Sequence, residues 1–161
     1  MPSAVVLAPL RASDAEDLVG LLEESDLRVW LRARDVDQLR ERFQGWEMRR
    51  SPDGREAWLN WIVRSAGDGR AIGWAQATVA DGAAQVAYAV LPGERGRGFA
   101  TGALVEMMSL LRDEHGVVFF EAHIDERNVG SQKVAAAAGL KRTDRTVRGE
   151  SVWTLSGAKA P

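Results

Sequence analysis

The sequence contains no cysteine and little that suits a membrane or a nucleic acid. Without thiols the chain can form no disulfide and no thiolate metal site, and it has no cysteine nucleophile. The formal net charge is −2, so no overall positive field attracts nucleic acid. No apolar run approaches the roughly 20 residues that cross a bilayer, and the first residues lack a signal-peptide pattern. We therefore expect a cytoplasmic protein with no nucleic-acid partner, no membrane partner and no metal.

The chain also lacks internal repeats, low-complexity tracts and a linker rich in Pro, Gly and Ser. A length of 161 residues is enough for one sizeable hydrophobic core but not comfortably for two. We therefore predict one domain over residues 1–161, with a loose C-terminal tail at 156–161.

Hydrophobic periodicity and turn residues predict a mixed α/β fold. A capping box at Ser13–Glu16 and a cap at Asp35 each open an amphipathic helix. A strand, a helix and a strand follow one another from 83 to 124, which implies one parallel pair in a mainly antiparallel sheet. The strands are predicted at 5–7, 57–63, 71–79, 83–90, 117–124 and on both sides of a turn at 148–150, and the later helices at 99–115 and 128–138.

The most informative stretch is RGRGFATGAL, residues 95–104, between a predicted strand and a predicted helix. Unpaired backbone N–H groups and the helix dipole favour an anion at such a place, and glycines allow its close approach. A dinucleotide-binding fingerprint needs glycine at Thr101, and a Walker loop needs lysine at Phe99, so neither motif fits. What remains is an Arg-x-x-Gly-x-Ala pattern from Arg95 to Ala100.

This pattern resembles the pyrophosphate loop of the GNAT superfamily of acetyl-CoA-dependent N-acetyltransferases, Gln/Arg-x-x-Gly-x-Gly/Ala. NVGSQKVAAAAGLKR at 128–142 is similar to the family's second cofactor motif, Asn-x-x-Ser/Ala followed by a short helix and Gly-Leu/Phe. EAHIDERNVGSQKV and the closing ESVWTL most resemble the branch of ribosomal-protein N-terminal acetyltransferases. The resemblance implies an α/β (α+β) fold in which the parallel strands splay apart and about four helices flank the sheet.

The resemblance also implies that acetyl-CoA is the cosubstrate. Its pyrophosphate would meet the backbone of the glycine-rich turn, with two arginines adding charge, and its pantetheine would pair with the end of the preceding strand. A backbone N–H there would polarise the thioester carbonyl, and the amine would attack directly without a covalent intermediate. The residues assigned to the cofactor in this way are Ala89, Val90, Leu91, Arg95, Gly96, Arg97, Gly98, Ala100, Thr101, Asn128 and Ser131.

Two polar residues near the end of the predicted strand 117–124 are candidates for the catalytic base. Glu121 and His123 are two positions apart, so on a strand their side chains point to the same face. His123 lies five residues before Asn128, where some family members carry a catalytic glutamate, and an imidazole titrates near neutrality. Glu121 could orient the ring or act through water. Which of the two is the base stays open, since a polar strand end can also simply meet solvent.

The catalytic acid is missing from its usual place. Many family members carry a tyrosine seven residues after the motif asparagine, but Ala135 stands there in this chain. The ribosomal N-terminal branch is understood to use a serine, so the resemblance assigns the acid role to Ser131. A water molecule or direct departure of the thiolate would also serve, and Asn128 and Ser131 can equally be helix caps.

The acceptor implied by the resemblance is a primary amine, for which a protein or peptide N-terminus is one candidate. Glu23, Glu24 and Asp26 are possible ligands for its charge, although a solvated helix end explains them as well. Two alternatives remain: N-acetylation of a small molecule such as an antibiotic or metabolite, and a non-catalytic acyl-CoA-binding module in which the missing tyrosine marks lost chemistry. The oligomeric state, monomer or homodimer, also stays open.

Overall fold

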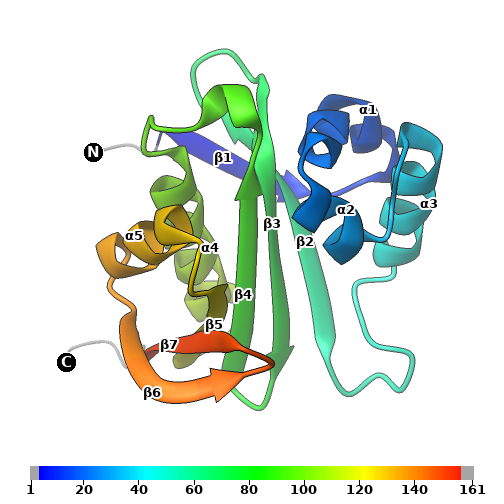
Figure 1. Cartoon of the computed structure of the whole chain (residues 1–161). Helices are drawn as coiled ribbons and strands as arrows, with labels where there is room; N and C mark the ends of the chain where they lie inside the picture. Colours follow the sequence, from blue (N-terminus) through cyan, green and yellow to red (C-terminus); the bar gives the residue numbers. More distant parts are fainter. Residues whose placement is uncertain (1–3, 157–161) are drawn as a thin grey trace.

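The computed structural model describes residues 4–156 as three layers, helix on sheet on helix. The strands are β1 (Val5–Pro9), β2 (Ala57–Ser65), β3 (Ala71–Ala80), β4 (Ala83–Val90), β5 (Phe119–Asp125), β6 (Lys141–Val147) and β7 (Glu150–Ser156). The helices are α1 (Ala15–Leu18), α2 (Ser25–Leu31), α3 (Val36–Trp46), α4 (Phe99–His115) and α5 (Val129–Ala137), with short 3-10 helices η1 (Ala12–Asp14), η2 (Val19–Glu23) and η3 (Pro92–Glu94). Figure 1 shows α1, α2 and α3 on one face of the sheet and α4 and α5 on the other.

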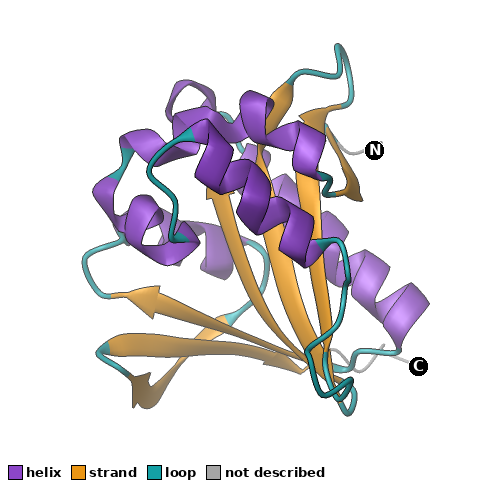
Figure 2. Cartoon of the chain, turned by 90° about the vertical axis from the view of Figure 1, so that its right-hand side faces the viewer, coloured by secondary structure: helices purple, strands orange, loops and turns teal. Residues whose placement is uncertain are grey.

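The strand order is β1-β2-β3-β4-β5-β7-β6, and every neighbouring pair is antiparallel except β4 and β5. This confirms the predicted mixed α/β fold with a mainly antiparallel sheet. The parallel pair is short, because Ala83–Gln85 pair with Phe119–Glu121 and no later residues of the two strands pair. Beyond that point β5 follows β7, while β4 stays with β3 as far as Val90. The two halves of the sheet therefore splay apart, as Figure 2 shows.

Each face of the sheet has its own hydrophobic core. Leu104, Met107 and Leu111 of α4 are buried against one face. Phe43 of α3 and Trp74 of β3 are buried together on the other face, with leucines from α1 and η2. Burial of both faces holds the splayed strands between two packed layers, because apolar area removed from water is the main stabilising contribution.

Several predicted helix ends are confirmed. The Asp35 carboxylate accepts a hydrogen bond from the Gln38 amide at 2.8 Å and so caps α3. Gly116 ends α4 in the left-handed conformation, with φ 62°.

Of the predicted tail at 156–161, Ser156 ends β7 and residues 157–161 lie outside the described residues. No described helix is both long and apolar enough to cross a membrane.

The prediction of one regular helix from Ser13 is wrong. This segment forms η1, α1 and η2 in succession, and its first capping bond is the Arg11 amide donating to the Asp14 carboxylate at 2.9 Å. Gly20 lies inside the segment and lowers its helix propensity. The helix α2, which directly follows, was not predicted, and it proves to form one side of the candidate site.

Candidate active site

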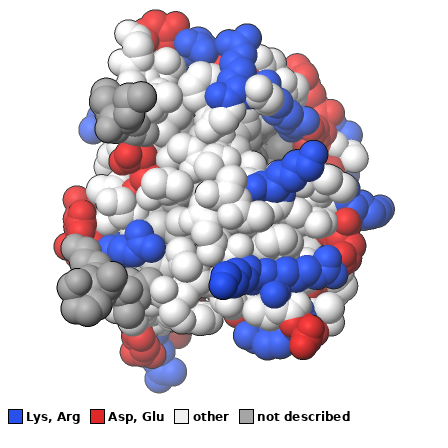
Figure 3. Space-filling model, turned by 90° about the vertical axis from the view of Figure 1, so that its left-hand side faces the viewer, with Lys and Arg blue, Asp and Glu red and all other residues white. Residues whose placement is uncertain are grey.

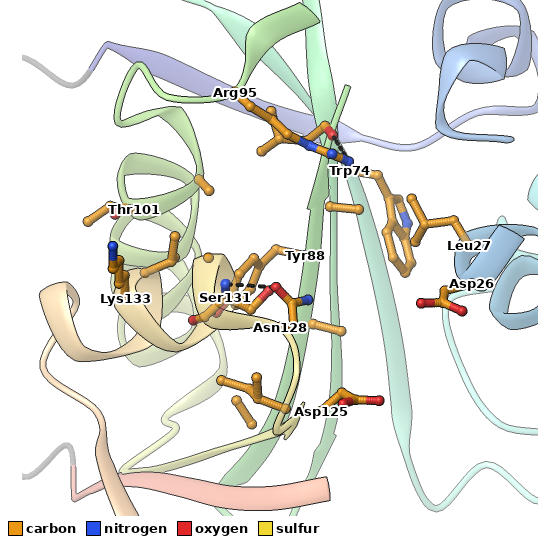
Figure 4. A pocket seen from close by; sticks show the side chains of 18 of the residues that line it. Asp26, Leu27, Trp74, Tyr88, Arg95, Thr101, Asp125, Asn128, Ser131 and Lys133 are labelled. Atoms are coloured by element: carbon orange, nitrogen blue, oxygen red, sulfur yellow. Dashed lines mark hydrogen bonds between the residues drawn. The ribbon is translucent and has the colours of Figure 1, made fainter. Parts of the chain in front are cut away.

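The splay between β4 and β5 opens into a cleft of about 1000 Å³. Figure 4 shows it between the helices α4 and α5 on one side and α2 on the other. The end of β4, from Val86 to Val90, forms its wall, and the end of β5 lies opposite. Because β4 has no strand partner on this side after Gln85, its outward backbone polar groups there are unpaired by any strand, although the Val90 carbonyl accepts a long hydrogen bond from Arg95 at 3.4 Å.

The glycine-rich turn before α4 lies at one end of this cleft. Gly96 and Gly98 have φ of 76° and 80°, in the region where side chains are strained. A Cβ at either position would meet nothing within 4 Å, so the backbone conformation, not crowding, requires glycine there. Gly98 is the N-cap of α4 and supplies no side-chain cap. The first turn of α4, with Ala100 and Thr101 in the cleft, is therefore free to receive an anion.

The two arginines of the turn are both paired with carboxylates. Arg97 lies 3.8 Å from Glu94, and Arg95 forms an ion pair with Glu24 at the start of α2. Glu94 is also bound by Arg70 at 2.9 Å, and these hydrogen bonds lower the pKa of its carboxyl below the usual value. Figure 3 shows further Lys and Arg side chains on the side of the molecule that carries α4 and α5, where they favour a polyanionic ligand.

The first turn of α5 also borders the cleft. Asn128 is the N-cap, and its side-chain oxygen accepts a hydrogen bond from the Ser131 amide at 3.0 Å. The Tyr88 hydroxyl of β4 donates to the Ser131 carbonyl at 3.0 Å, so it ties the splayed strand to this turn. Burial raises the pKa of Tyr88 to about 12, which keeps the phenol neutral at ordinary pH.

Tyr88 was not among the predicted site residues. It is the chain's single tyrosine, and it lies on a strand that alternates large and small side chains. That alternation indicates a face toward the core, but only the splay shows that this face borders a cleft.

His123 and Glu121 are in contact, and only His123 lines the cleft. His123 Nε2 lies 3.1 Å from Glu121 Oε2, and Arg145 of β6 donates to Glu121 Oε1 at 3.1 Å. If Nε2 carries the proton that Glu121 accepts, Nδ1 carries the lone pair. The Gln85 amide nitrogen approaches Nδ1 at 3.4 Å, which is a long and weak contact. The imidazole therefore has one nitrogen held by a carboxylate and the other held only by this weak contact.

The other side of the cleft combines aromatic and acidic side chains. Trp30 of α2 is 47% exposed and meets Trp74 edge to face, with ring centroids 4.9 Å apart. Glu24 and Asp26 also line this side, whereas the third predicted carboxylate, Glu23, does not. Asp125 lies across the cleft in Figure 4, and hydrogen bonds from the neighbouring arginine at 127 lower its pKa to about 2. This side of the cleft therefore offers both aromatic surface and negative charge to a ligand.

Most of the predicted cofactor residues come together in the cleft. Two do not: the Leu91 amide donates to the Ile72 carbonyl of β3 at 2.8 Å, and Arg97 lies outside the cleft lining. The described part of the chain contains no group of three or more His, Asp and Glu side chains that could hold a metal ion. The predicted cofactor residues that do line the cleft are Ala89, Val90, Arg95, Gly96, Gly98, Ala100, Thr101, Asn128 and Ser131.

Several solved structures share this fold. RimJ from Mycobacterium smegmatis in complex with CoA-disulfide has a TM-score of 0.78 and 20% identity, with 98% of this chain and 84% of that chain covered. Aminoglycoside acetyltransferase AAC(6')-Ib in complex with coenzyme A has a TM-score of 0.75 and 18% identity, with 94% of each chain covered. A putative ribosomal-protein-serine acetyltransferase from Vibrio cholerae has a TM-score of 0.75 and 16% identity, with 97% and 95% covered.

No curated protein matches the sequence. Residues 4–141 do match the family described as the acetyltransferase (GNAT) domain. This match spans most of the chain and agrees with the strand order, the short parallel pair and the uncapped glycine turn described above. The chain therefore belongs to the GNAT acetyltransferase family.

Proposed function

We propose that the protein is an acetyl-CoA-dependent N-acetyltransferase that moves an acetyl group to a primary amine. The observation that carries the proposal is the continuity of one cleft from the uncapped first turn of α4, past the open edge of β4, to the imidazole of His123. A phosphate-bearing cofactor and a base for an amine thus share one space. The CoA complexes of RimJ and of AAC(6')-Ib support acetyl-CoA as the cosubstrate.

The cofactor side is suited to a long, anionic thioester. The amides of Gly98, Ala100 and Thr101 bind the pyrophosphate, and the open backbone from Ala89 to Val90 pairs with the pantetheine. Arg97 adds charge at the margin, whereas the Leu91 amide is already bonded to β3 and is not free to pair with the pantetheine. Bound acetyl-CoA supplies the activated acetyl group.

His123 acts as the base in this proposal, and Glu121 positions it. Nδ1 of His123 takes the proton from the acceptor ammonium, and the free amine attacks the thioester carbonyl. Glu121 stabilises the resulting imidazolium through Nε2 and is itself held by Arg145. This division of roles follows from the cleft, which His123 lines and Glu121 does not.

Ser131 meets the leaving sulfur as a hydrogen-bond donor. A thiol has a reference pKa of about 8.5, so the coenzyme A thiolate can leave without taking the proton of Ser131 completely. The serine hydroxyl is a much weaker acid than the thiol and contributes a hydrogen bond. Tyr88 is a weaker acid than an ordinary phenol, because burial raises its pKa to about 12. Its proton is also already donated to the Ser131 carbonyl. Tyr88 therefore braces the turn that presents Ser131.

The acceptor class is the finer part of the proposal. The Vibrio cholerae structure, a putative ribosomal-protein-serine acetyltransferase, supports a protein acceptor, in line with the resemblance to the ribosomal-protein N-terminal acetyltransferases. The AAC(6')-Ib structure with coenzyme A and kanamycin supports a small-molecule amine equally well. Ala135, in place of the usual tyrosine, supports the non-catalytic module. An activity measurement separates these three.

The test is thiol release from acetyl-CoA against a panel of short peptides and small amines. We expect amine-dependent release by the wild type and a fall in turnover of about 100-fold to 1000-fold in His123→Gln, with acetyl-CoA binding retained. The matched control is His115→Gln, because His115 is exposed at the end of α4 and outside the cleft.

Two results would contradict the proposal. Binding of acetyl-CoA without turnover on any amine would favour the non-catalytic module. Full activity of His123→Gln on a good acceptor would remove the histidine from the base role while leaving the acetyltransferase itself intact.

A further inference from the structure

Arg95 connects the two sides of the cleft. It leaves the glycine-rich turn on the cofactor side, and its guanidinium pairs with Glu24 at the start of α2 on the acceptor side. The same guanidinium donates to the Val90 carbonyl at 3.4 Å. Figure 4 shows the side chain running past the end of β4, where the cleft begins. The Arg95 guanidinium therefore contacts both the Glu24 carboxylate and the Val90 carbonyl at the edge of β4.

Arg95 is a more important partner for Glu24 than Arg97 is for Glu94, the carboxylate that precedes the glycine-rich turn. Glu94 is bound by Arg70 through both oxygens, at 2.9 and 3.0 Å, in addition to its longer contact with Arg97. Among residues 4–156, Arg95 is the one ion-pair partner recorded for Glu24. The two side chains are 47% and 38% exposed, so the pair is weak enough to exchange partners.

A diphosphate is a stronger partner for a guanidinium than one half-exposed carboxylate, because it offers more charge and bidentate oxygens. Arg95 is adjacent in sequence to Gly96, the first glycine of the turn that receives the anion. When the guanidinium moves to the phosphate, it frees the Val90 carbonyl and leaves Glu24 as an unpaired carboxylate in the cleft. Both groups are then available at the places where the pantetheine and a cationic acceptor would lie.

We propose that Glu24 recognises the cationic group of the acceptor and that Arg95 covers it until acetyl-CoA binds. This inference rests on the proposed function, since it takes acetyl-CoA and an amine as the two substrates. It predicts positive coupling between them, because the cofactor removes a competitor from the acceptor's carboxylate. Glu24 is therefore a specificity-determining residue, and Arg95 switches between two anions.

Binding of coenzyme A, followed by calorimetry, tests the competition directly. Glu24→Gln removes the competing carboxylate, so we expect coenzyme A to bind about 3-fold to 10-fold more tightly than to the wild type. Arg95→Gln weakens binding. In the Arg95→Gln background, Glu24→Gln has no effect, because the residue that mediated the competition is gone.

Glu23→Gln is the matched control, since it removes the same charge one residue away, outside the cleft lining. An equal gain in affinity in Glu23→Gln, or the persistence of the Glu24→Gln gain without Arg95, would mean that only long-range charge acts and would overturn the inference. Failure of the wild type to bind coenzyme A at all would instead overturn the proposed function.

Acceptor kinetics give the second readout. With an amine found active in the panel, Glu24→Gln should raise the acceptor KM while the affinity for coenzyme A rises. These two effects have opposite signs, which a misfolded variant cannot produce. An unchanged acceptor KM would remove Glu24 from acceptor recognition.

Discussion

The two sides of the cleft, which we propose receive the cofactor and the acceptor, are built in different ways. The cofactor side comes mainly from one continuous segment, β4 to the first turn of α4, and uses backbone groups held by left-handed glycines. The acceptor side is made of side chains from α2, β3 and β5. Backbone recognition leaves a local glycine pattern in a sequence, because few other residues adopt those conformations. Side-chain recognition assembled from distant segments leaves no comparable pattern.

The largest effect is expected from blocking the backbone side. Gly98→Trp adds a bulky side chain at a left-handed position in the anion site, and we expect coenzyme A affinity to fall by at least about 100-fold. Gly54→Trp is the matched control: it has φ 73°, open space around its Cβ and a position outside the cleft lining. Calorimetry measures both variants, and circular dichroism checks the fold. Equal losses in the two variants would show general destabilisation rather than a blocked site.

The next effect should appear only on the acceptor side. Trp30→Ala removes an aromatic surface from the cleft and should raise the acceptor KM about 10-fold, with the affinity for coenzyme A unchanged. Met48→Ala is the control, because Met48 is 77% exposed and lies outside the cleft lining. Steady-state kinetics on an active amine measures the split. A parallel loss of coenzyme A affinity would mean that the two sides are not separate.

A smaller effect is expected between the two sides, at the leaving group. Ser131→Ala keeps the backbone amide that Asn128 caps but removes the hydroxyl. Turnover should fall about 5-fold to 10-fold, and the affinity for coenzyme A should change less. Ser109→Ala, an exposed serine on α4, is the control. If turnover and affinity fall together, or neither changes, the hydroxyl does not act on the leaving sulfur.

The smallest effect concerns the brace across the splay. Tyr88→Phe should lower the free energy of unfolding by about 1 kcal/mol at neutral pH, because one partly buried hydrogen bond is lost. Since the pKa of the phenol rises from about 10 to about 12 on folding, its contribution is full below about pH 10 and lost as the pH rises toward 12. The variant should lose that alkaline dependence.

Tyr88 can be titrated directly, because it is the single tyrosine of the chain. Phenolate absorbance in the near ultraviolet should appear at higher pH in the folded protein than in the unfolded protein. Ionisation at the same pH in both states would show that the hydroxyl is not buried against α5, and the brace would then be absent.

The sequence predicted the elements around the glycine-rich turn well and the first helical segment poorly. The caps at Asp35 and Gly116, the antiparallel strands before β4 and the parallel unit after it follow from local signals, and all are present. The break of the first helix and the existence of α2 were missed. Apolar spacing shows which residues face a core, but it does not distinguish one regular helix from several short turns that bury the same leucines.

By itself, the sequence determined the local features that depend on neighbouring residues: glycines at left-handed positions before a helix without a side-chain cap, and two polar side chains on one face of β5. The tertiary structure alone decided which side chains meet across the splay. Arg95 forms an ion pair with Glu24, and the Tyr88 hydroxyl donates to the Ser131 carbonyl. His123 lines the cleft, whereas Glu121 does not. The physical reason is that such contacts join residues far apart in the chain, so they depend on how the two halves of the sheet separate and not on any local preference.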